Sequence, residues 1–226
     1  MKVLSISNIE SIRHEFLDFT GEWYEAFGRP ERSGCWIIYG KSGTGKSSFA
    51  LQLARQMDEL GLRVLFLTLE MGTCADFQAD LRTVGIRSGV NKITFVESCT
   101  IEELDDYLSR QRSPDVVFID SVQYFEKQCG ATSEGIIRLR KKYPRKIFVF
   151  ISHVDGKEVE GKTAYDVKRD SYKRIYVEGW KASYAGRGNG GPRGYYVVWA
   201  DGYRRYWVKN NINEEDNGNN EENDRQ

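Results

Sequence analysis

Short hydrophobic runs alternate with longer amphipathic segments through most of this chain. Five apolar runs predict buried strands, at residues 35–40, 63–69, 92–98, 115–120 and 146–152. Helical patterns lie between them, at residues 46–60, 100–112 and 133–143, and Thr100 with Glu103 forms a capping box for the second of these helices. Strands that alternate with helices predict an α/β fold, with a mostly parallel central sheet flanked by helices.

The two ends of the chain carry different patterns. Apolar residues near helical spacing across residues 7–27 predict a helical leader over residues 1–32, interrupted at Gly21. After residue 170, the segments RIYVEGW, GYYVVWA and YRRYWVK predict short β segments that add an antiparallel extension near the C-terminus. We expect the aromatic residues of these segments to pack across a hairpin. The central domain is predicted to span residues 33–210.

Charge is distributed unevenly along the chain. The 226 residues have a net charge of zero, but residues 211–226 carry six acidic residues against one arginine, so the rest is positively charged. This tail contains no aromatic residue and is predicted to be disordered. The chain has no apolar run long enough for a membrane span and no signal-peptide pattern at its start, so we expect a cytoplasmic protein. Four well-separated cysteines and two histidines predict reduced thiols rather than a zinc site.

The motif GKSGTGKSS connects the first predicted strand to the first long helix. It fits the P-loop pattern G-x-x-x-x-G-K-[ST], in which glycines let backbone N–H groups point at phosphate oxygens. Lys46 is expected to reach the β- and γ-phosphates, and the Ser47 hydroxyl to hold Mg²⁺. The predicted site for ATP consists of Gly40, Lys41, Ser42, Gly43, Thr44, Gly45, Lys46, Ser47 and Ser48.

Two carboxylates follow predicted strands and complete the predicted chemistry. Asp120 ends the run DVVFID, and the carboxyl ends of parallel strands are where ligands bind in open α/β sheets, so Asp120 is the second predicted magnesium ligand. Ser121 occupies the position where many P-loop enzymes have a catalytic glutamate. Glu70, at the end of the next strand after the P-loop helix, is therefore predicted to activate the attacking water. A structural cap is the alternative role for Glu70.

Several segments together resemble the RecA-like ATPases, especially the DnaB helicase core and the RadA/KaiC branch. LTLEMG is similar to the strand end that carries the catalytic glutamate of DnaB-type helicases, and VFIDSVQYF is similar to the Walker B segment of RadA. FISHVDGKEVEGK resembles a RadA strand that ends in histidine. The resemblance covers about residues 33–208 and implies a RecA-like fold. The chain has neither the zinc and protease-like modules of RadA nor the N-terminal domain of DnaB, which suggests a stand-alone core of phage or mobile-element type.

The resemblance also implies roles for later residues. His153 matches the γ-phosphate sensor position of the family, with a buried structural histidine as the alternative. KASYAGRGNGGPRG resembles the DnaB segment that supplies Lys and Arg to a neighbouring subunit's nucleotide. Arg187 is the first candidate for this trans-acting group and Lys181 the second; Arg193 remains open. A group that acts between subunits implies a homo-oligomeric ring, expected to be a hexamer.

Two functions remain open at this point. Loops that follow the strands carry Lys127, Lys157, Lys162, Lys168 and Arg169, which by resemblance would face a ring channel and contact single-stranded DNA. The first hypothesis is therefore an ATP-driven motor in replication or recombination. The alternative is an ATP-dependent switch or assembly factor that controls an unidentified protein partner without translocation along nucleic acid. The near-neutral charge of the whole chain weakens the first hypothesis.

Overall fold

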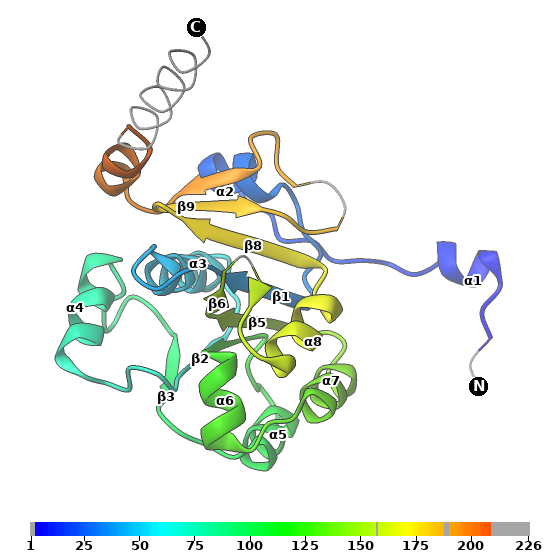
Figure 1. The fold of residues 1–226 in the computed structure, drawn as a ribbon. Helices are drawn as coiled ribbons and strands as arrows, with labels where there is room; N and C mark the ends of the chain where they lie inside the picture. The colour runs from blue at the N-terminus through cyan, green and yellow to red at the C-terminus, as the bar shows by residue number, and fades with distance from the viewer. Residues whose placement is uncertain (1–2, 157, 188–189, 209–226) are drawn as a thin grey trace, which may run out of the picture.

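A computed structural model describes residues 3–156, 158–187 and 190–208. Its centre is an eight-stranded sheet with the order β10-β9-β8-β1-β5-β4-β2-β3 (Figure 1). The strands of this sheet are β1 (Gly34–Tyr39), β2 (Val64–Thr68), β3 (Thr94–Val96), β4 (Val116–Asp120), β5 (Ile147–Ser152), β8 (Lys173–Glu178), β9 (Lys181–Tyr184) and β10 (Tyr195–Val197). The first six in this list pair in parallel, whereas β9 and β10 pair antiparallel. The predicted parallel sheet and its antiparallel extension are confirmed.

Helices cover both faces of the sheet. The described helices are α1 (Ile6–Glu10), α2 (Gly21–Phe27), α3 (Lys46–Glu59), α4 (Ala75–Thr83), α5 (Ile101–Ser109), α6 (Val122–Cys129), α7 (Ser133–Lys142) and α8 (Lys162–Asp170), with a further helical segment at residues 200–208. Neighbouring side chains of a strand point to opposite faces. In β1, Trp36 and Ile38 therefore enter the cluster under α2, α3 and α4, and Cys35 and Ile37 enter the cluster under α5 to α8.

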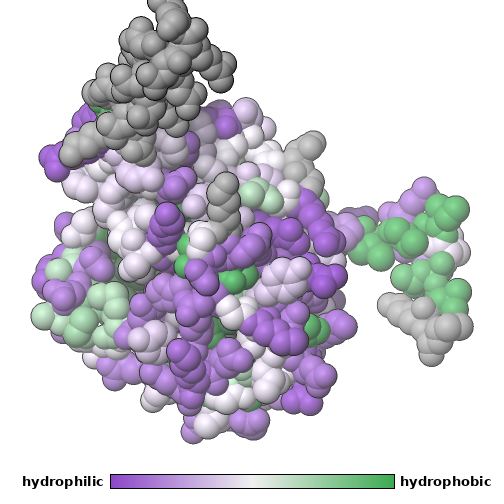
Figure 2. Space-filling view, in the orientation of Figure 1, coloured by the Kyte–Doolittle hydropathy of each residue, from purple (hydrophilic) through white to green (hydrophobic). Residues whose placement is uncertain are grey.

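The N-terminal segment differs from the predicted leader. Gly21, the expected break, is instead the first residue of α2; residues 11–20 are not helical, and Phe16 makes an isolated β-bridge with Glu31. Leu17 and Phe19 are buried while Phe16 and Asp18 are exposed, which is the alternation of an extended segment. Helix α1 projects from the body of the molecule as an arm without buried residues (Figures 1 and 2).

The β assignment of YRRYWVK is wrong. Residues 200–208 are helical, and the ring of Tyr203 contacts that of Trp207 four residues later. The aromatic positions 199, 203, 206 and 207 are three or four residues apart, which is helical spacing. The expected aromatic packing occurs elsewhere: Tyr196 of β10 stacks on Trp23 of α2. The acidic tail lies outside the described residues. The five strands and three helices predicted in the central domain are present with ends that differ by a few residues, whereas α4, α6 and α8 were not predicted.

Two negative features complete the description. All four cysteines are free thiols, as expected. In the described part of the chain, every helix is too short or too polar to cross a bilayer.

The small hairpin of β6 (Val154–Asp155) and β7 (Glu158–Val159) follows β5 at the carboxyl edge of the sheet, the edge where the parallel strands end.

Candidate nucleotide-binding and catalytic site

The P-loop connects β1 to α3 at the carboxyl edge of the sheet. Gly40 is in close contact with β8: a Cβ atom on Gly40 would lie 2.1 Å from the Val177 carbonyl oxygen. Gly45 has a φ of +100° and is the N-cap residue of α3, and a Cβ there would lie 2.7 Å from the Trp180 ring. Both positions therefore require glycine, and the start of α3 directs its free N–H groups and positive helix end toward the loop.

Lys46, the P-loop lysine, is held against the loop. Its ammonium group donates a hydrogen bond of 2.8 Å to the Lys41 carbonyl oxygen, and its side chain is largely buried. Burial lowers the pKa of Lys46, and the nearby carboxylates of Asp120 and Glu70 oppose that shift. The lysine is thus a partly desolvated cation next to two acids, which is a suitable arrangement for binding a polyphosphate.

Asp120 ends β4, between β2 and β5. Burial and, to a smaller extent, the neighbouring Glu70 raise its pKa to about 7, although His153, Lys46 and a hydrogen bond from Ser47 act in the opposite direction. The peptide bond that follows Asp120 is cis. A buried carboxylate near a second one gains most from a cation, so Ser47 and Asp120 are well suited to share Mg²⁺.

The magnesium site would be an open one. Among the described residues, no group of three or more histidine, cysteine, aspartate or glutamate side chains could enclose a metal ion. Mg²⁺ commonly keeps several waters and binds through one or two protein oxygens together with substrate phosphates. The donor set of one hydroxyl and one carboxylate therefore fits Mg²⁺ that arrives with a nucleotide.

Glu70 forms an ion pair with His153. The distance from His153 Nε2 to Glu70 Oε2 is 2.9 Å, and both side chains are partly exposed, at 24% and 32%. The hydrogen bond between them raises the pKa of His153 and lowers the pKa of Glu70. The pair forms because β2 and β5 lie on either side of β4, and because the backbone N–H groups of Leu69 and Glu70 both donate to the Asp120 carbonyl oxygen.

A single cavity of about 170 Å³ brings most of the predicted residues together. It is lined by Ser42, Gly43, Gly45, Lys46, Ser47, Ser48, Glu70, Asp120, His153 and Trp180. Of the predicted P-loop residues, Gly40, Lys41 and Thr44 shape the loop without lining this cavity. Glu70 and Asp120 therefore lie on the same side of the sheet as Lys46, as the predicted chemistry requires.

Trp180 is the site residue that sequence reasoning missed. It forms, with Gly179, the two-residue turn between β8 and β9, and both residues have positive φ values, of 62° and 51°. Its backbone N–H donates to the Thr44 carbonyl oxygen, and its ring packs against Gly45. The dipeptide Gly-Trp between two β segments is the local signal of this turn, but only the tertiary structure places the turn against the P-loop.

The predicted trans-acting residues lie outside this cavity. The Lys181 ammonium lies 3.6 Å from the centre of the Trp207 ring, and Arg193 donates to the Tyr195 carbonyl oxygen and is partly buried. Arg187 is exposed, and its backbone N–H donates to the carbonyl oxygen of Tyr172, just before the start of β8. Arg187 therefore lies at the amino edge of the sheet, where the parallel strands begin, far along β8 from its own P-loop.

The basic residues predicted to contact DNA have different surroundings. Lys127 on α6 and Arg169 on α8 are exposed, whereas Lys162 is exposed but pairs with Asp166 at 2.7 Å. Lys157 lies outside the described residues. Of three aromatic residues near these cations that could stack on bases, Phe125 is fully buried in the core and Tyr124 is half-buried, whereas Tyr165 is exposed.

Lys168 is the clearest departure from the predicted DNA-binding set. Its side chain is only 14% exposed; the ammonium is 2.8 Å from a Glu158 oxygen and 4.4 Å from the centre of the Tyr39 ring. These contacts hold the charge inside the molecule, because a desolvated ammonium needs a carboxylate or an aromatic face. Lys168 therefore contacts other residues of the protein, and the sequence pattern gave no indication of these contacts.

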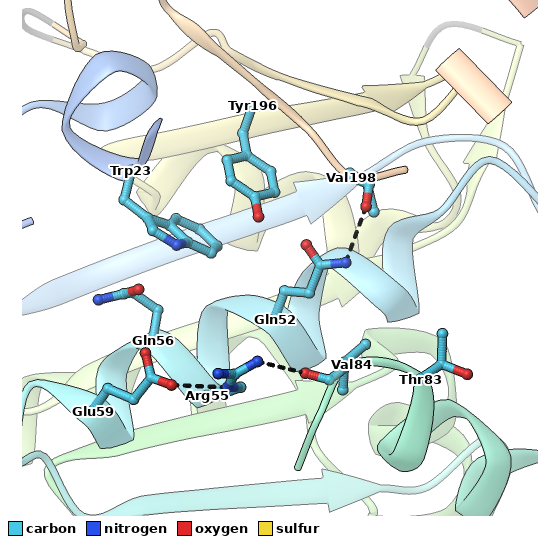
Figure 3. A pocket seen from close by; sticks show the side chains of 9 residues that line it. All are labelled: Trp23, Gln52, Arg55, Gln56, Glu59, Thr83, Val84, Tyr196 and Val198. Carbon is cyan, nitrogen blue, oxygen red and sulfur yellow. Dashed lines mark hydrogen bonds and ion pairs between the residues drawn. The ribbon is translucent and has the colours of Figure 1, made fainter. Parts of the chain in front are cut away.

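A second cavity, of about 370 Å³, lies beside α3 (Figure 3). In it the Gln52 amide donates to the Val198 carbonyl oxygen, and the Arg55 guanidinium donates to the Val84 carbonyl oxygen. These bonds fasten the segments after β10 and α4 to α3. None of the predicted catalytic residues lines this cavity.

Comparison with known proteins finds a family match over the part of the chain that contains the P-loop. Residues 34–141 match a family model described as an AAA domain, a range that includes the P-loop, Glu70 and Asp120. The chain has a P-loop and the RecA-like fold. Its P-loop, its mostly parallel sheet and the two acids at the carboxyl edge are the features on which this assignment rests.

Solved structures show the same fold for this RecA-like domain. The flagellar accessory protein FlaH from Methanocaldococcus jannaschii is similar with a TM-score of 0.61 and 14% identity, over 83% of this chain and 100% of that chain. The ATPase domain of G40P is similar with a TM-score of 0.52 and 12% identity, over 70% of this chain and 78% of that one. The resemblance to the DnaB core is confirmed at the level of the fold.

A curated relative is more similar in sequence. "Probable mitochondrial chaperone bcs1" from Schizosaccharomyces pombe is 31% identical over 172 residues, which is 72% of this chain. The match covers 36% of the length of that protein, so this RecA-like domain corresponds to about a third of it.

Proposed function

We propose that this protein binds ATP with Mg²⁺ and hydrolyses it to ADP and phosphate. The observation that carries the proposal is the single cavity lined by Lys46, Ser47, Glu70, Asp120 and His153, which come from four separate segments of the chain. The P-loop N–H groups and Lys46 bind the phosphates, and Ser47 and Asp120 hold Mg²⁺. Bound Mg²⁺ supplies positive charge that stabilises the developing charge on the phosphate oxygens.

Glu70 accepts a proton from the attacking water. The water oxygen forms a bond to the γ-phosphorus, the bond from that phosphorus to the bridging oxygen breaks, and ADP leaves with the bonding electrons. Ion pairing with His153 keeps Glu70 ionised and fixes the direction of its carboxylate. His153 thus positions Glu70. It also lines the same cavity, where we expect it to contact the γ-phosphate.

We propose further that the protein acts as a homo-oligomeric ring on single-stranded DNA. The catalytic cavity has Lys46 and His153 as its basic residues, and among the described residues no arginine lines it. A cation from a neighbouring subunit would complete such a site, and exposed Arg187 is our candidate, with Lys181 as the second. Such groups accelerate phosphoryl transfer by about 10³–10⁵. The resemblance to the DnaB core is the basis for the hexamer and for DNA as partner.

Substitution of the P-loop lysine tests the ATPase. Lys46→Ala is expected to abolish nucleotide binding and phosphate release, measured with a fluorescent ATP analogue and a phosphate assay in Mg²⁺. Lys92→Ala, an exposed lysine outside the site, is the matched control and should behave like the wild type. Unchanged turnover in Lys46→Ala would exclude the proposed site. Stimulation of wild-type turnover by single-stranded DNA, together with mass measurement in the presence of ATP, tests the ring and its substrate.

A second candidate function is supported by the sequence relative. The curated protein that matches 72% of this chain is described as a chaperone, and FlaH is described as an accessory protein. The same ATPase site could therefore serve an assembly factor that changes a protein partner without nucleic acid. A turnover rate that neither single-stranded DNA nor RNA changes, with no salt-sensitive binding of either, would favour this alternative.

A further inference from the structure

A cleft at the amino edge of the sheet has the composition of a polyanion-binding surface. This amino-edge cleft has a volume of about 590 Å³ and lies between the starts of β1 and β8 and the end of α7. Five cationic side chains and one carboxylate, that of Glu31, line it; the cations are Arg29, Arg140, Lys141, Lys173 and Arg187. Excess positive charge in a concave surface attracts phosphate chains and is neutralised by them.

Three of these cations, Lys141, Lys173 and Arg187, have no carboxylate partner in the described part of the chain; Lys173 is half-buried and donates to the Tyr184 hydroxyl oxygen. Arg140 pairs with Asp170, and Arg29 pairs with Asp18, so their charges are largely compensated within the protein. In contrast, Lys141 at the end of α7 and Arg187 are exposed and appear in none of the ion pairs of the described residues. Their charges are available to an external ligand.

Exposed aromatic rings lie among these cations. Tyr172 and Phe16 line the cleft and are 54% and 49% exposed, which is unusual for rings of this size. The Arg187 guanidinium lies 6.0 Å from the centre of the Tyr172 ring. Arg187 also borders the adjacent cleft of α8, where Arg169 lies 5.9 Å from the ring of Tyr165, itself 47% exposed. Two exposed Arg–Tyr pairs therefore follow one another across this surface.

The carboxylates near the second pair are mostly compensated. In the cleft of α8, Lys162 donates a hydrogen bond to Asp166, and Arg140 donates one to Asp170. Glu134 is therefore the lining carboxylate whose negative charge can reduce the positive charge of Arg169. Figure 2 shows a predominantly hydrophilic surface over α7 and α8, consistent with a face that binds a charged ligand.

We infer that single-stranded nucleic acid binds along this surface, with phosphates on Lys141 and Arg169 and bases stacked on Tyr172 and Tyr165. Aromatic rings and cations in alternation suit a single strand, because its bases are unpaired and can stack while its backbone follows the charges. An acidic peptide would use the cations but leave the rings unused. The inference rests on the proposed function and moves the main nucleic-acid contact away from the loops of the carboxyl edge.

Binding of a fluorescein-labelled oligothymidylate, followed by fluorescence anisotropy over a series of salt concentrations, tests the inference. Tyr172→Ala and Tyr165→Ala should each weaken binding by about 5- to 150-fold, the range for loss of one stacked base. Lys141→Gln should reduce the salt dependence by about 0.7 in the slope of log K against log salt, the value for one phosphate of a single strand. Arg187 is left out, because its loss would also remove the proposed trans-acting group.

Matched controls separate this surface from other sites. Tyr24→Ala removes an exposed tyrosine elsewhere, on α2, and Lys92→Gln removes an exposed lysine elsewhere; neither should change binding. Lys127→Gln tests the carboxyl-edge alternative and should also have no effect. Melting temperature and ATP-analogue binding should match the wild type in every variant, since the substituted side chains are on the surface.

The possible failures are distinct. If the wild type binds no oligothymidylate, both this inference and the DNA part of the proposed function are wrong. If the wild type binds but the Tyr172, Tyr165 and Lys141 variants behave like the controls, only the location inferred here is wrong. Equal binding of duplex DNA, or equally strong competition by polyglutamate, would show that charge alone is recognised and would overturn the stacking.

Discussion

The two edges of the central sheet carry their charges in opposite ways. At the carboxyl edge, Lys46, Glu70, Asp120 and His153 are partly or fully buried and compensate one another. At the amino edge, Lys141 is exposed and has no carboxylate partner in the described part of the chain. Reaction chemistry needs desolvated groups at set positions, whereas a binding surface for a long polymer needs accessible charge. The contrast indicates that the two edges serve different purposes.

Substitution of Arg187 tests whether the amino edge of one subunit contacts the nucleotide site at the carboxyl edge of its neighbour. Arg187→Gln is expected to lower turnover by about 10³–10⁵, because it removes the proposed trans-acting charge. Mixing it with Lys46→Ala should restore part of the activity, since each variant supplies what the other lacks. Phosphate release from the mixture against each variant alone is the measurement. No recovery in a mixture shown by mass to co-assemble would count against a role in trans.

Glu70 is the next largest expected effect. Glu70→Gln should lower the single-turnover hydrolysis rate by about 10²–10⁴, the usual contribution of a general base, while ATP-analogue affinity changes little. Glu59→Gln at the far end of α3, where the carboxylate pairs with Arg55, is the control and should hydrolyse normally. Near-normal turnover in Glu70→Gln would leave Glu70 as no more than the ion-pair partner of His153.

Two glycines of the P-loop allow a matched test of packing at the carboxyl edge. Gly43→Ala and Gly45→Ala both place a side chain at positive φ, which costs about 1–2 kcal/mol. Only at Gly45 does the new Cβ also meet the Trp180 ring, since nothing lies within 4 Å at Gly43. Gly45→Ala should therefore lower the free energy of unfolding and the ATP affinity more than Gly43→Ala. Adding Trp180→Ala should remove the difference; equal effects of the two glycine variants would contradict the contact.

The ion pair of Glu70 and His153 predicts a small pH effect in the nucleotide-free protein. The pKa of His153 is raised, so its contribution is complete below its ordinary value of 6.5 and is lost as pH rises through the raised value. The pKa of Glu70 is lowered, so its contribution is complete above 4.5 and is lost as pH falls through the lowered value. The ion pair therefore stabilises the folded protein most between about pH 4.5 and 6.5.

Thermal unfolding of His153→Gln against the wild type over this pH range measures the effect. The difference in unfolding free energy should be largest near pH 5–6, at about 1 kcal/mol or less because both side chains are partly exposed, and should shrink above neutrality. In a double-mutant cycle, Glu70→Gln should remove the same difference, and the double variant should add little more. A difference that does not change with pH would show that the two side chains are not coupled.

Local patterns of the chain were sufficient for much of the fold and part of the site. Strands β1, β2, β4 and β5 appear as apolar runs because both of their faces are covered, and the capping box at Thr100 is present as predicted. The P-loop could be predicted because all its residues are contiguous. The helix at residues 200–208 was misassigned because its aromatic residues resemble β segments, although their spacing is helical.

The sequence by itself thus determined the elements, the phosphate-binding loop and the two acids at strand ends, since these depend on neighbours within a few residues. Tertiary structure alone decided the strand order that puts Asp120 between Glu70 and His153, and the turn that brings Trp180 against Gly45. It also decided that Lys168 is engaged inside the molecule while Arg187 and Tyr172 are exposed together. The physical reason is that contacts between distant segments follow from how the whole sheet buries its two faces, which no short stretch of sequence specifies.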